Sequence, residues 1–251
     1  MENYPRHQNL YFLTPEKDQF EKAYLEVRNK EGRVYADDLV RQLPHLPKGH
    51  PQELEWNLRR WNTHRLLSYI AKSKPERVLD LGCGNGWLTH QLATAAKAQV
   101  LGLDVNRLEL LQAARLFTND HCRFAYGDIF QAACPKKYFD AIVLDSCVQY
   151  FSDLPQLLDR LLILLRANGK IHILDSPIYL AKDLDDARQR TSDYYQTKGS
   201  GAMAQHYFHH SWADFDSYTT QVLYQPKSTK ARLRRKLLGK GSPFPWIIIS
   251  S

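Results

Sequence analysis

The sequence has 251 residues, of which 43% are hydrophobic and 24% are charged, and its formal net charge is +7 at pH 7. These values fit one large domain, or one domain with an appendage, and exclude an intrinsically disordered chain. No apolar run approaches the roughly 18 residues of a membrane span, the first residues lack a signal-peptide core, and the cysteines form no C-x-x-C pair, so we expect reduced thiols in a cytoplasmic protein.

Residues 1–74 are predicted to form a helical N-terminal extension. Thr14, followed by a proline and an acidic residue, is typical of a helix start. Apolar spacing predicts further helices over residues 35–43 and 52–71. We therefore divide the chain into this extension and a domain formed by residues 75–251.

Residues 77–89 contain the motif around which the chain is organised. A short apolar run that includes one acid, Asp80, leads into a turn, and helical spacing begins after the turn. Glycines occupy every second position of the turn: Gly82, Gly84 and Gly86. This order predicts a strand, a glycine turn and a helix, the first βα unit of an open α/β sheet. Glycines there allow a positive φ and let a ligand lie against the main chain.

The spacing of these glycines separates two classes of ligand. A dinucleotide fold needs G-x-G-x-x-G, but Trp87 stands where that pattern has its last glycine. The spacing G-x-G-x-G after an acid resembles motif I of the class I S-adenosylmethionine-dependent methyltransferases. The resemblance covers residues 77–176 and implies S-adenosylmethionine as the cofactor. It implies cofactor contacts at Asp80, Gly82, Cys83, Gly84, Asn85 and Gly86.

The chain after the glycine turn continues as a series of βα units. Apolar runs predict parallel strands at residues 77–81, 99–103, 122–125, 139–144 and 170–174. Aromatic and β-branched residues predict two more strands, at residues 218–224 and 245–250. The predicted fold class is α/β, a Rossmann-like seven-stranded, mostly parallel sheet with helices on both faces. The resemblance implies that the last strand is antiparallel.

Acidic residues follow three further predicted strands. Asp104 stands 24 residues after Asp80, a separation at which an acid binds ribose hydroxyls in Rossmann-like sites. The resemblance implies that Asp128 accepts a hydrogen bond from the adenine amino group and that Asp145 lies near the methionine end. With their neighbours, the expected cofactor contacts in this series are Asp104, Val105, Asn106, Asp128, Ile129 and Asp145.

The loop after the fourth strand narrows the class of acceptor. Amino-methyltransferases of DNA and of some proteins carry an Asn/Asp-Pro-Pro turn here, but residues 145–151 contain no proline. The loop resembles instead the small-molecule branch, which includes lipid, sugar and natural-product methyltransferases. Candidate contacts to a small-molecule acceptor are Trp56, Gln149, Tyr150, Ser176 and Tyr207.

Residues 178–212 follow the fifth strand and are expected to form a substrate lid. A Gly-Ser-Gly hinge precedes a cluster of aromatic and histidine residues in this segment. His209 or His210 is a candidate general base, because histidine titrates near neutral pH, although packing histidines fit the same pattern. No second pair of His or Cys stands at metal-ligand spacing, so no metal site is expected.

A basic segment at residues 227–240 leaves an alternative open. Its cations are Lys227, Lys230, Arg232, Arg234, Arg235, Lys236 and Lys240. Such a patch can track phosphates, so an RNA methyltransferase is one alternative, and an acidic membrane surface or a phosphorylated acceptor would meet the same charge. A non-catalytic cofactor-binding or scaffold protein is another. The lack of an appended RNA-binding module in the sequence favours the small-molecule acceptor.

Overall fold

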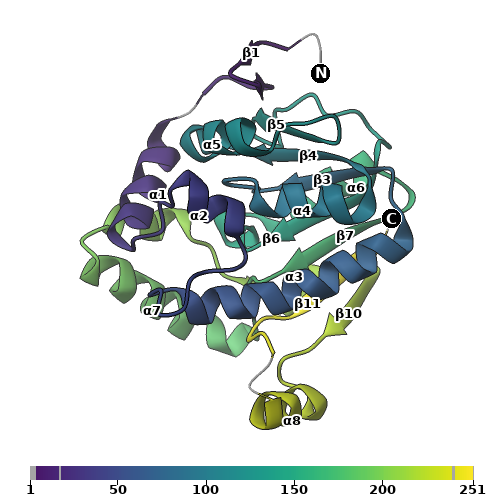
Figure 1. Ribbon diagram of the computed structural model, residues 1–251. Coiled ribbons are helices and arrows are strands. Elements are labelled where there is room, and N and C mark those ends of the chain that lie inside the picture. The colour runs from purple at the N-terminus through teal and green to yellow at the C-terminus, as the bar shows by residue number, and fades with distance from the viewer. Residues whose placement is uncertain (1–3, 17, 239–240, 251) are drawn as a thin grey trace.

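The computed structural model describes residues 4–16, 18–238 and 241–250, and one large β-sheet forms its centre (Figure 1). The strands of this sheet are β1 (Arg6–His7), β2 (Leu10–Phe12), β3 (Arg77–Leu81), β4 (Gln99–Asp104), β5 (Cys122–Tyr126), β6 (Phe139–Asp145), β7 (Leu165–Leu174), β10 (Thr220–Tyr224) and β11 (Trp246–Ser250). They lie in the order β1-β2-β5-β4-β3-β6-β7-β11-β10. A separate parallel pair is formed by β8 (Ile178–Tyr179) and β9 (His210–Ser211).

The middle of the sheet is the parallel series β5-β4-β3-β6-β7. Strand β3 lies between β4 and β6, so the strand order reverses there and leaves a crevice beyond the carboxyl ends of these strands. Strand β11 lies between β7 and β10 and runs antiparallel to both. The predicted mostly parallel, Rossmann-like sheet with an antiparallel last strand is therefore confirmed.

Two short strands near the N-terminus enlarge the predicted seven-stranded sheet to nine. Strand β2 pairs in parallel with β5, with Leu10 opposite Phe124, and β1 pairs antiparallel with β2. Leu10 and Tyr11 are buried, which stabilises this added edge. The N-terminal extension therefore contains two strands besides its helices, whereas the sequence predicts helices alone. The strands escape prediction because two or three residues are too few to show an alternating pattern.

Helices cover both faces of the sheet (Figure 1). They are α1 (Asp18–Lys30), α2 (Asp37–Gln42), α3 (Glu53–Ser73), α4 (Trp87–Ala96), α5 (Arg107–Phe117), α6 (Leu154–Leu164), α7 (Leu184–Thr197) and α8 (Thr229–Leu238). Helices α3, α4 and α5 share one buried apolar cluster with alternate strand residues such as Val78 and Val100, and α6 shares a second cluster with Leu79 and Leu103. None of the helices described is both long and apolar enough to cross a membrane.

The segment after β7 packs against the N-terminal extension. Val27 of α1, Tyr195 of α7 and Met203 of a following 3-10 helix form a small buried cluster. Residues 178–212 and the N-terminal extension therefore meet next to the carboxyl ends of the central strands (Figure 1).

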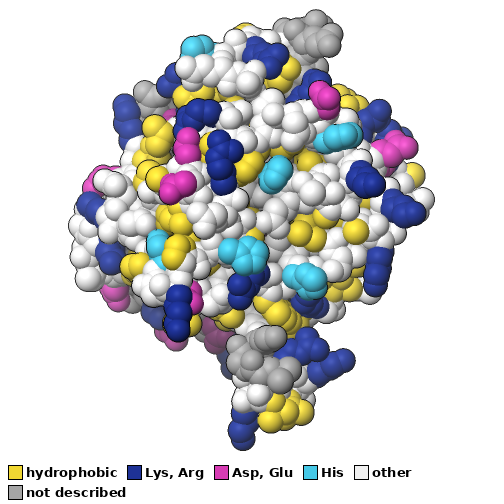
Figure 2. All heavy atoms as spheres, viewed as in Figure 1, with side chains coloured by type: hydrophobic (Ala, Val, Ile, Leu, Met, Phe, Trp, Pro, Cys, Tyr) yellow, Lys and Arg dark blue, Asp and Glu magenta, His cyan; other side chains and the backbone are white. Residues whose placement is uncertain are grey.

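Helix α8 stands apart from the sheet at the foot of the molecule (Figure 1). Leu233 and Leu237 are exposed, and Figure 2 shows Lys and Arg side chains around a hydrophobic group at this end. Ala231, in contrast, is buried, and Arg235 donates a hydrogen bond to the carbonyl of Pro226 at 2.6 Å. The predicted basic segment is therefore largely this helix, whereas Lys240 lies outside the described residues.

Candidate functional site

Two adjoining cavities open beyond the carboxyl ends of the central strands. Their volumes are about 450 Å³ and about 330 Å³, and we call them the larger and the smaller cavity. The residues that line both are Tyr24, Gly82, Gly84, Glu109, Ser146 and Tyr150. The predicted glycine turn therefore forms part of the wall of each cavity.

The glycine turn after β3 has a backbone that glycine adopts most readily. The φ angle is +75° at Gly82, +51° at Gly84 and +76° at Gly86. A Cβ atom on Gly86 would lie 2.6 Å from the ring of Phe124, and one on Gly82 would lie 2.5 Å from Cβ of Cys147. Gly82 and Gly84 line the cavities, whereas Gly86 lines neither and instead lets α4 approach the sheet.

Asp104 at the end of β4 fixes the glycine turn to the start of the next helix. Its carboxylate accepts a hydrogen bond from the backbone N–H of Gly84 at 2.8 Å, and from those of Val105 and Asn106 at 2.7 and 2.8 Å. Burial raises the pKa of Asp104, and the three N–H groups partly oppose that rise. The carboxylate is thus held rigidly in the wall of the smaller cavity.

The smaller cavity brings together the residues predicted to contact adenosine. Asp104, Val105, Asn106, Asp128 and Ile129 all line it. The rest of its wall is largely aromatic, with Phe20, Tyr24, Tyr126, Phe130, Tyr150, Phe151 and Phe208. An apolar, aromatic cavity with a few fixed carboxylates suits a flat heterocycle that carries a sugar.

Asp80 lines the larger cavity from within β3. Its carboxylate accepts a hydrogen bond from Oγ1 of Thr89 at 2.6 Å. Burial raises the pKa of Asp80 to about 7, and the charges of Asp145 and Asp104 add to that rise. A positively charged group that enters the cavity would favour the ionised form, so this acid suits an ammonium ligand.

Asp145 and Asp175 form a second acidic group in the larger cavity. Asp175 accepts hydrogen bonds from Asn62 of α3 and, at 3.2 Å, from Oγ of Ser242. Burial and the nearby charge of Asp145 raise the pKa of Asp175 to about 8. The sequence places Asp175 at the carboxyl end of the fifth predicted strand, pointing at the site, but Asn62 and Ser242 join it only in the fold.

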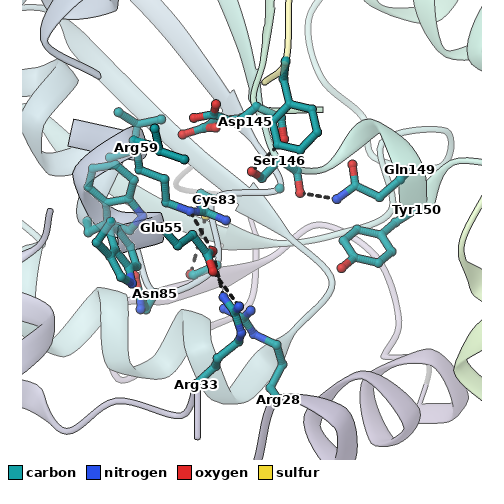
Figure 3. Close-up of a pocket in the computed structure, with 18 of the residues that line it drawn as sticks. Arg28, Arg33, Glu55, Arg59, Cys83, Asn85, Asp145, Ser146, Gln149 and Tyr150 are labelled. Atoms are coloured by element: carbon teal, nitrogen blue, oxygen red, sulfur yellow. Dashed lines mark hydrogen bonds and ion pairs between the residues drawn. The ribbon is translucent and has the colours of Figure 1, made fainter. Parts of the chain in front are cut away.

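The outer wall of the larger cavity carries charges that sequence analysis does not predict. Glu55 of α3 accepts two hydrogen bonds from Arg33, at 2.7 and 2.5 Å, and a third from Arg59 at 3.2 Å (Figure 3). Burial alone would raise the pKa of Glu55, but these two arginines lower it to about 2. Arg28 of α1 lines the same wall. The larger cavity therefore offers both acids and guanidinium groups to a polar ligand.

The family described as a methyltransferase domain matches residues 72–230 of this chain. The chain belongs to this family. The predicted methyltransferase family is therefore confirmed, and S-adenosylmethionine is the methyl donor that the prediction assigns to it. The residues present fit this cofactor, because Gly82 and Gly84 present bare main chain to both cavities. The cavities carry an aromatic wall at one end and buried acids at the other.

Two curated relatives of the methyltransferase resemble part of the chain. The malonyl-[acyl-carrier protein] O-methyltransferase of Halalkalibacterium halodurans is 29% identical over 125 residues, which are 45% of this chain and 46% of that protein. The trans-aconitate 2-methyltransferase of Deinococcus radiodurans is 39% identical over 110 residues, 43% of this chain and 41% of that protein. The chain spans about half the length of the curated relatives that it matches.

A solved structure resembles the methyltransferase along most of its length. The plantazolicin methyltransferase BpumL, crystallised with a pentazolic desmethylPZN analog and S-adenosylhomocysteine (SAH), superposes with a TM-score of 0.52. The match covers 90% of this chain and 98% of that one at 16% identity. At this identity the likeness concerns the fold.

Four of the five residues predicted to contact the acceptor line the larger cavity of the methyltransferase: Trp56, Gln149, Tyr150 and Tyr207. Nε2 of Gln149 donates to the carbonyl of Ser146 at 2.7 Å (Figure 3), and Nε1 of Trp56 donates to the hydroxyl of Tyr35 at 2.9 Å. Ser176 lies elsewhere, because it is buried and its hydroxyl donates to the carbonyl of Leu174.

The two histidines predicted as a general base lie outside both cavities of the methyltransferase. His210 is buried in β9, where its Nε2 lies 3.0 Å from the carbonyl oxygen of Val148. Nε2 of His209 lies 2.8 Å from Oγ1 of Thr191, and burial lowers the pKa of His209. The geometry does not support these histidines as the general base. The ring of His209 contacts α7, and the ring of His210 contacts the loop after β6.

Proposed function

We propose that this methyltransferase transfers a methyl group from S-adenosylmethionine directly to a small-molecule acceptor in the larger cavity. The observation that carries the proposal is the pair of adjoining cavities with the glycine turn in their common wall. The smaller cavity suits adenosine, and the larger cavity gathers the acids and guanidinium groups that an amino acid and a polar acceptor require.

The cofactor contacts follow from the places of the residues in the two cavities. In the smaller cavity, Asp104 would hold the ribose hydroxyls, and Asp128 with Ile129 would contact the adenine. In the larger cavity, Asp80 and Asp145 would bind the ammonium group of the amino acid, because a cation restores the ionisation that burial opposes.

The chain contributes alignment, water exclusion and a proton site to the reaction. The bound cofactor supplies a methyl group on a cationic sulfur, so the residues around it need mainly to align the acceptor, a contribution of about 7–11 kcal/mol in favourable cases. A base is required only where the acceptor atom carries a proton. Asp175 lines the larger cavity and its pKa is raised to about 8, so its ionised form can take up such a proton there.

The names of the two curated relatives support an acceptor of modest size. They identify the malonyl group of malonyl-[acyl-carrier protein] and trans-aconitate as the acceptors on which those proteins act. The cavity of about 450 Å³ has the size of a typical small-molecule site. For this chain we propose a small acceptor group of the same class, but neither of these individual compounds.

We propose that residues 1–74 and 178–212 close the cavities as a cap and a lid. Tyr24 and Trp56 of the N-terminal extension line the larger cavity. Tyr207 lines the larger and Phe208 the smaller cavity, and the backbone N–H of Phe208 donates to the carbonyl of Gln149 at 2.7 Å. These contacts support a lid that is attached to the loop after β6 and covers both ligands.

We also propose that the protein works in the cytoplasm. Its four cysteines, Cys83, Cys122, Cys134 and Cys147, are buried and unpaired. Unpaired thiols suit a reducing compartment. Fusion to a fluorescent protein followed by cell fractionation would test this location.

Cofactor binding and label transfer together test the proposed activity. Calorimetry should detect SAH binding, and methyl-labelled S-adenosylmethionine should label members of a panel of small acids, amines and alcohols. Asp104→Ala should lose both signals, whereas Asp120→Ala should retain them, because Asp120 is exposed and lines neither cavity. Failure of the wild-type protein to bind SAH would overturn the proposal.

RNA methylation remains a second candidate because α8 exposes several cations. Lys230, Arg232, Arg234 and Lys236 are exposed and line neither cavity, so they are free to meet a phosphate backbone. A gel shift with bulk tRNA at physiological salt separates the two candidates. Retarded tRNA that is also labelled by the methyl donor would favour RNA, whereas the small-molecule acceptor predicts neither result.

A further inference from the structure

Arg28 of α1 is partly buried, and the described part of the chain provides no hydrogen-bond acceptor for its side chain. Its Nε is buried without a partner, and the group lies over the ring of Tyr24 at 5.5 Å, in the wall of the larger cavity. Burial lowers the pKa of Arg28, but Tyr24, Glu109 and Tyr150 raise it above its ordinary value. The group is therefore a cation at every physiological pH.

The acids near Arg28 are engaged elsewhere or only partly charged. Arg33 takes both carboxylate oxygens of Glu55, and Arg59 adds a bond to one of them (Figure 3). Glu109 forms no described ion pair with Arg28, and burial raises its pKa to about 7. Within residues 4–16, 18–238 and 241–250, Arg28 is thus left without a carboxylate of its own.

An arginine whose Nε is buried without an acceptor is unusual for a stable fold. The guanidinium carries five N–H donors and cannot lose its proton, so burial without partners is costly. Buried polar groups that lack a protein partner call for one from outside the chain. A ligand in the larger cavity can reach this side chain, because Arg28 lines that cavity.

The surrounding charges select the kind of anion. The same cavity is lined by Asp80, Asp145 and Asp175, which would repel a doubly charged phosphate. One guanidinium without a hydrogen-bonded carboxylate calls for one negative charge. A carboxylate supplies that charge, and its two oxygens match the paired N–H groups of the guanidinium.

We infer that Arg28 binds the carboxylate of a ligand in the larger cavity, so that the ligand class is a carboxylic acid. The inference rests on the proposed function, which brings two carboxylates to this cavity, that of the methionine part of the cofactor and that of an acidic acceptor. Both sources present the same chemistry to Arg28.

Titrations with two nucleosides test whether the cofactor supplies the carboxylate that Arg28 binds. SAH and 5′-methylthioadenosine differ in the amino-acid part, which the second compound lacks. If Arg28 binds the cofactor, Arg28→Gln weakens SAH binding tenfold or more and leaves 5′-methylthioadenosine unchanged. Arg28→Lys should restore part of the loss, since it keeps the charge without the planar fork. Arg60→Gln is the matched control, because Arg60 is exposed on α3 outside both cavities.

Thermal melts of the SAH-saturated protein test whether the acceptor supplies the carboxylate that Arg28 binds. Hexanoate, glutarate and benzoate are each compared with the corresponding neutral amide. If Arg28 binds the acceptor, the acids raise the melting temperature and the amides do not. Arg28→Gln then loses this response and keeps its SAH affinity.

Two results for a folded Arg28→Gln protein would overturn the inference. In the first, the variant keeps both the SAH affinity and the acid-induced rise in melting temperature of the wild type. In the second, the wild type shows no such rise and the variant keeps the SAH affinity. Circular dichroism establishes folding, and Arg28→Lys takes over both measurements if the glutamine variant does not fold. A wild-type protein that binds neither nucleoside overturns the proposed function itself, which distinguishes the two failures.

Discussion

Asp145 and Asp175 stand at the ends of neighbouring strands, and each has one buried carboxylate oxygen without a protein partner in the wall of the larger cavity. Asn62 and Ser242 hold Asp175 from α3 and from the segment before β11. Two buried acids so placed ionise together only at a high cost, so one proton is retained between them near neutral pH.

Replacement of Asp175 by Asn should change how stability depends on pH. Burial and Asp145 raise the pKa of the Asp175 carboxyl from 3.8 to about 8 in the folded state. The stabilisation from its protonated form is therefore full below about pH 4 and is lost as the pH rises through 8. Asn cannot ionise, so from pH 5 to pH 8 the Asp175→Asn variant should gain about 4 kcal/mol relative to the wild type. Urea unfolding at the two pH values measures this gain, and an equal difference at both would contradict it.

Replacement of Gly86 by Ala should destabilise the fold. The residue has φ of +76°, and its new Cβ would lie 2.6 Å from the ring of Phe124. The left-handed backbone costs about 1–2 kcal/mol and overpacking about 1–3 kcal/mol more. Gly49→Ala is the matched control, because Gly49 has φ of +85° with no atom within 4 Å of a Cβ. Equal unfolding free energies for the two variants would exclude the packing role.

Replacement of Gly84 by Ala should affect the ligand more than the fold. Its Cβ would lie 3.1 Å from Oε2 of Glu109, at the end of a flexible side chain, and would project into a wall shared by both cavities. We expect a stability loss close to that of Gly49→Ala, of the order of 1 kcal/mol. SAH affinity, measured by calorimetry, should fall at least tenfold. Unchanged affinity would show that no ligand lies against the turn.

Replacement of His209 by Asn should leave methyl transfer nearly unchanged. Its ring contacts Thr191 and lines neither cavity. His210→Asn should instead lower stability by about 1–3 kcal/mol, because that buried ring bonds the carbonyl of Val148. A general base contributes about 10²–10⁴-fold to the rate. A loss of methyl-transfer rate of that size in His209→Asn, at unchanged SAH affinity, would show that His209 acts as the general base.

Much of the sheet and of the adenosine end could be predicted because their signals are local. Strand β3 occupies the predicted residues 77–81, since a buried parallel strand is a nearly continuous apolar run. The acids at the ends of β3 and β4 and the glycines after β3 lie close together in the sequence. The residues expected around adenosine therefore line one cavity.

The acceptor end depends on contacts that no local pattern reveals. Asp175 meets Asn62 across 113 residues and Ser242 across 67. Arg28 follows Tyr24 by four residues on α1, so its place on the same stripe could be recognised, but a charged helical residue ordinarily faces water. The pairing of β8 with β9 likewise turns His210 into the interior, although its sequence neighbours Tyr207 and Phe208 reach the cavities.

Helix α1 contributes to both cavities with a single stripe of side chains. Phe20 and Tyr24 line the smaller cavity, and Tyr24 and Arg28 line the larger one. A ligand that orders the shared Tyr24 ring in one cavity also shapes the wall of the other, and such a coupling of affinities is reciprocal. Donor and acceptor should therefore bind with mutual preference, and the spent donor and the methylated product should hinder each other's departure.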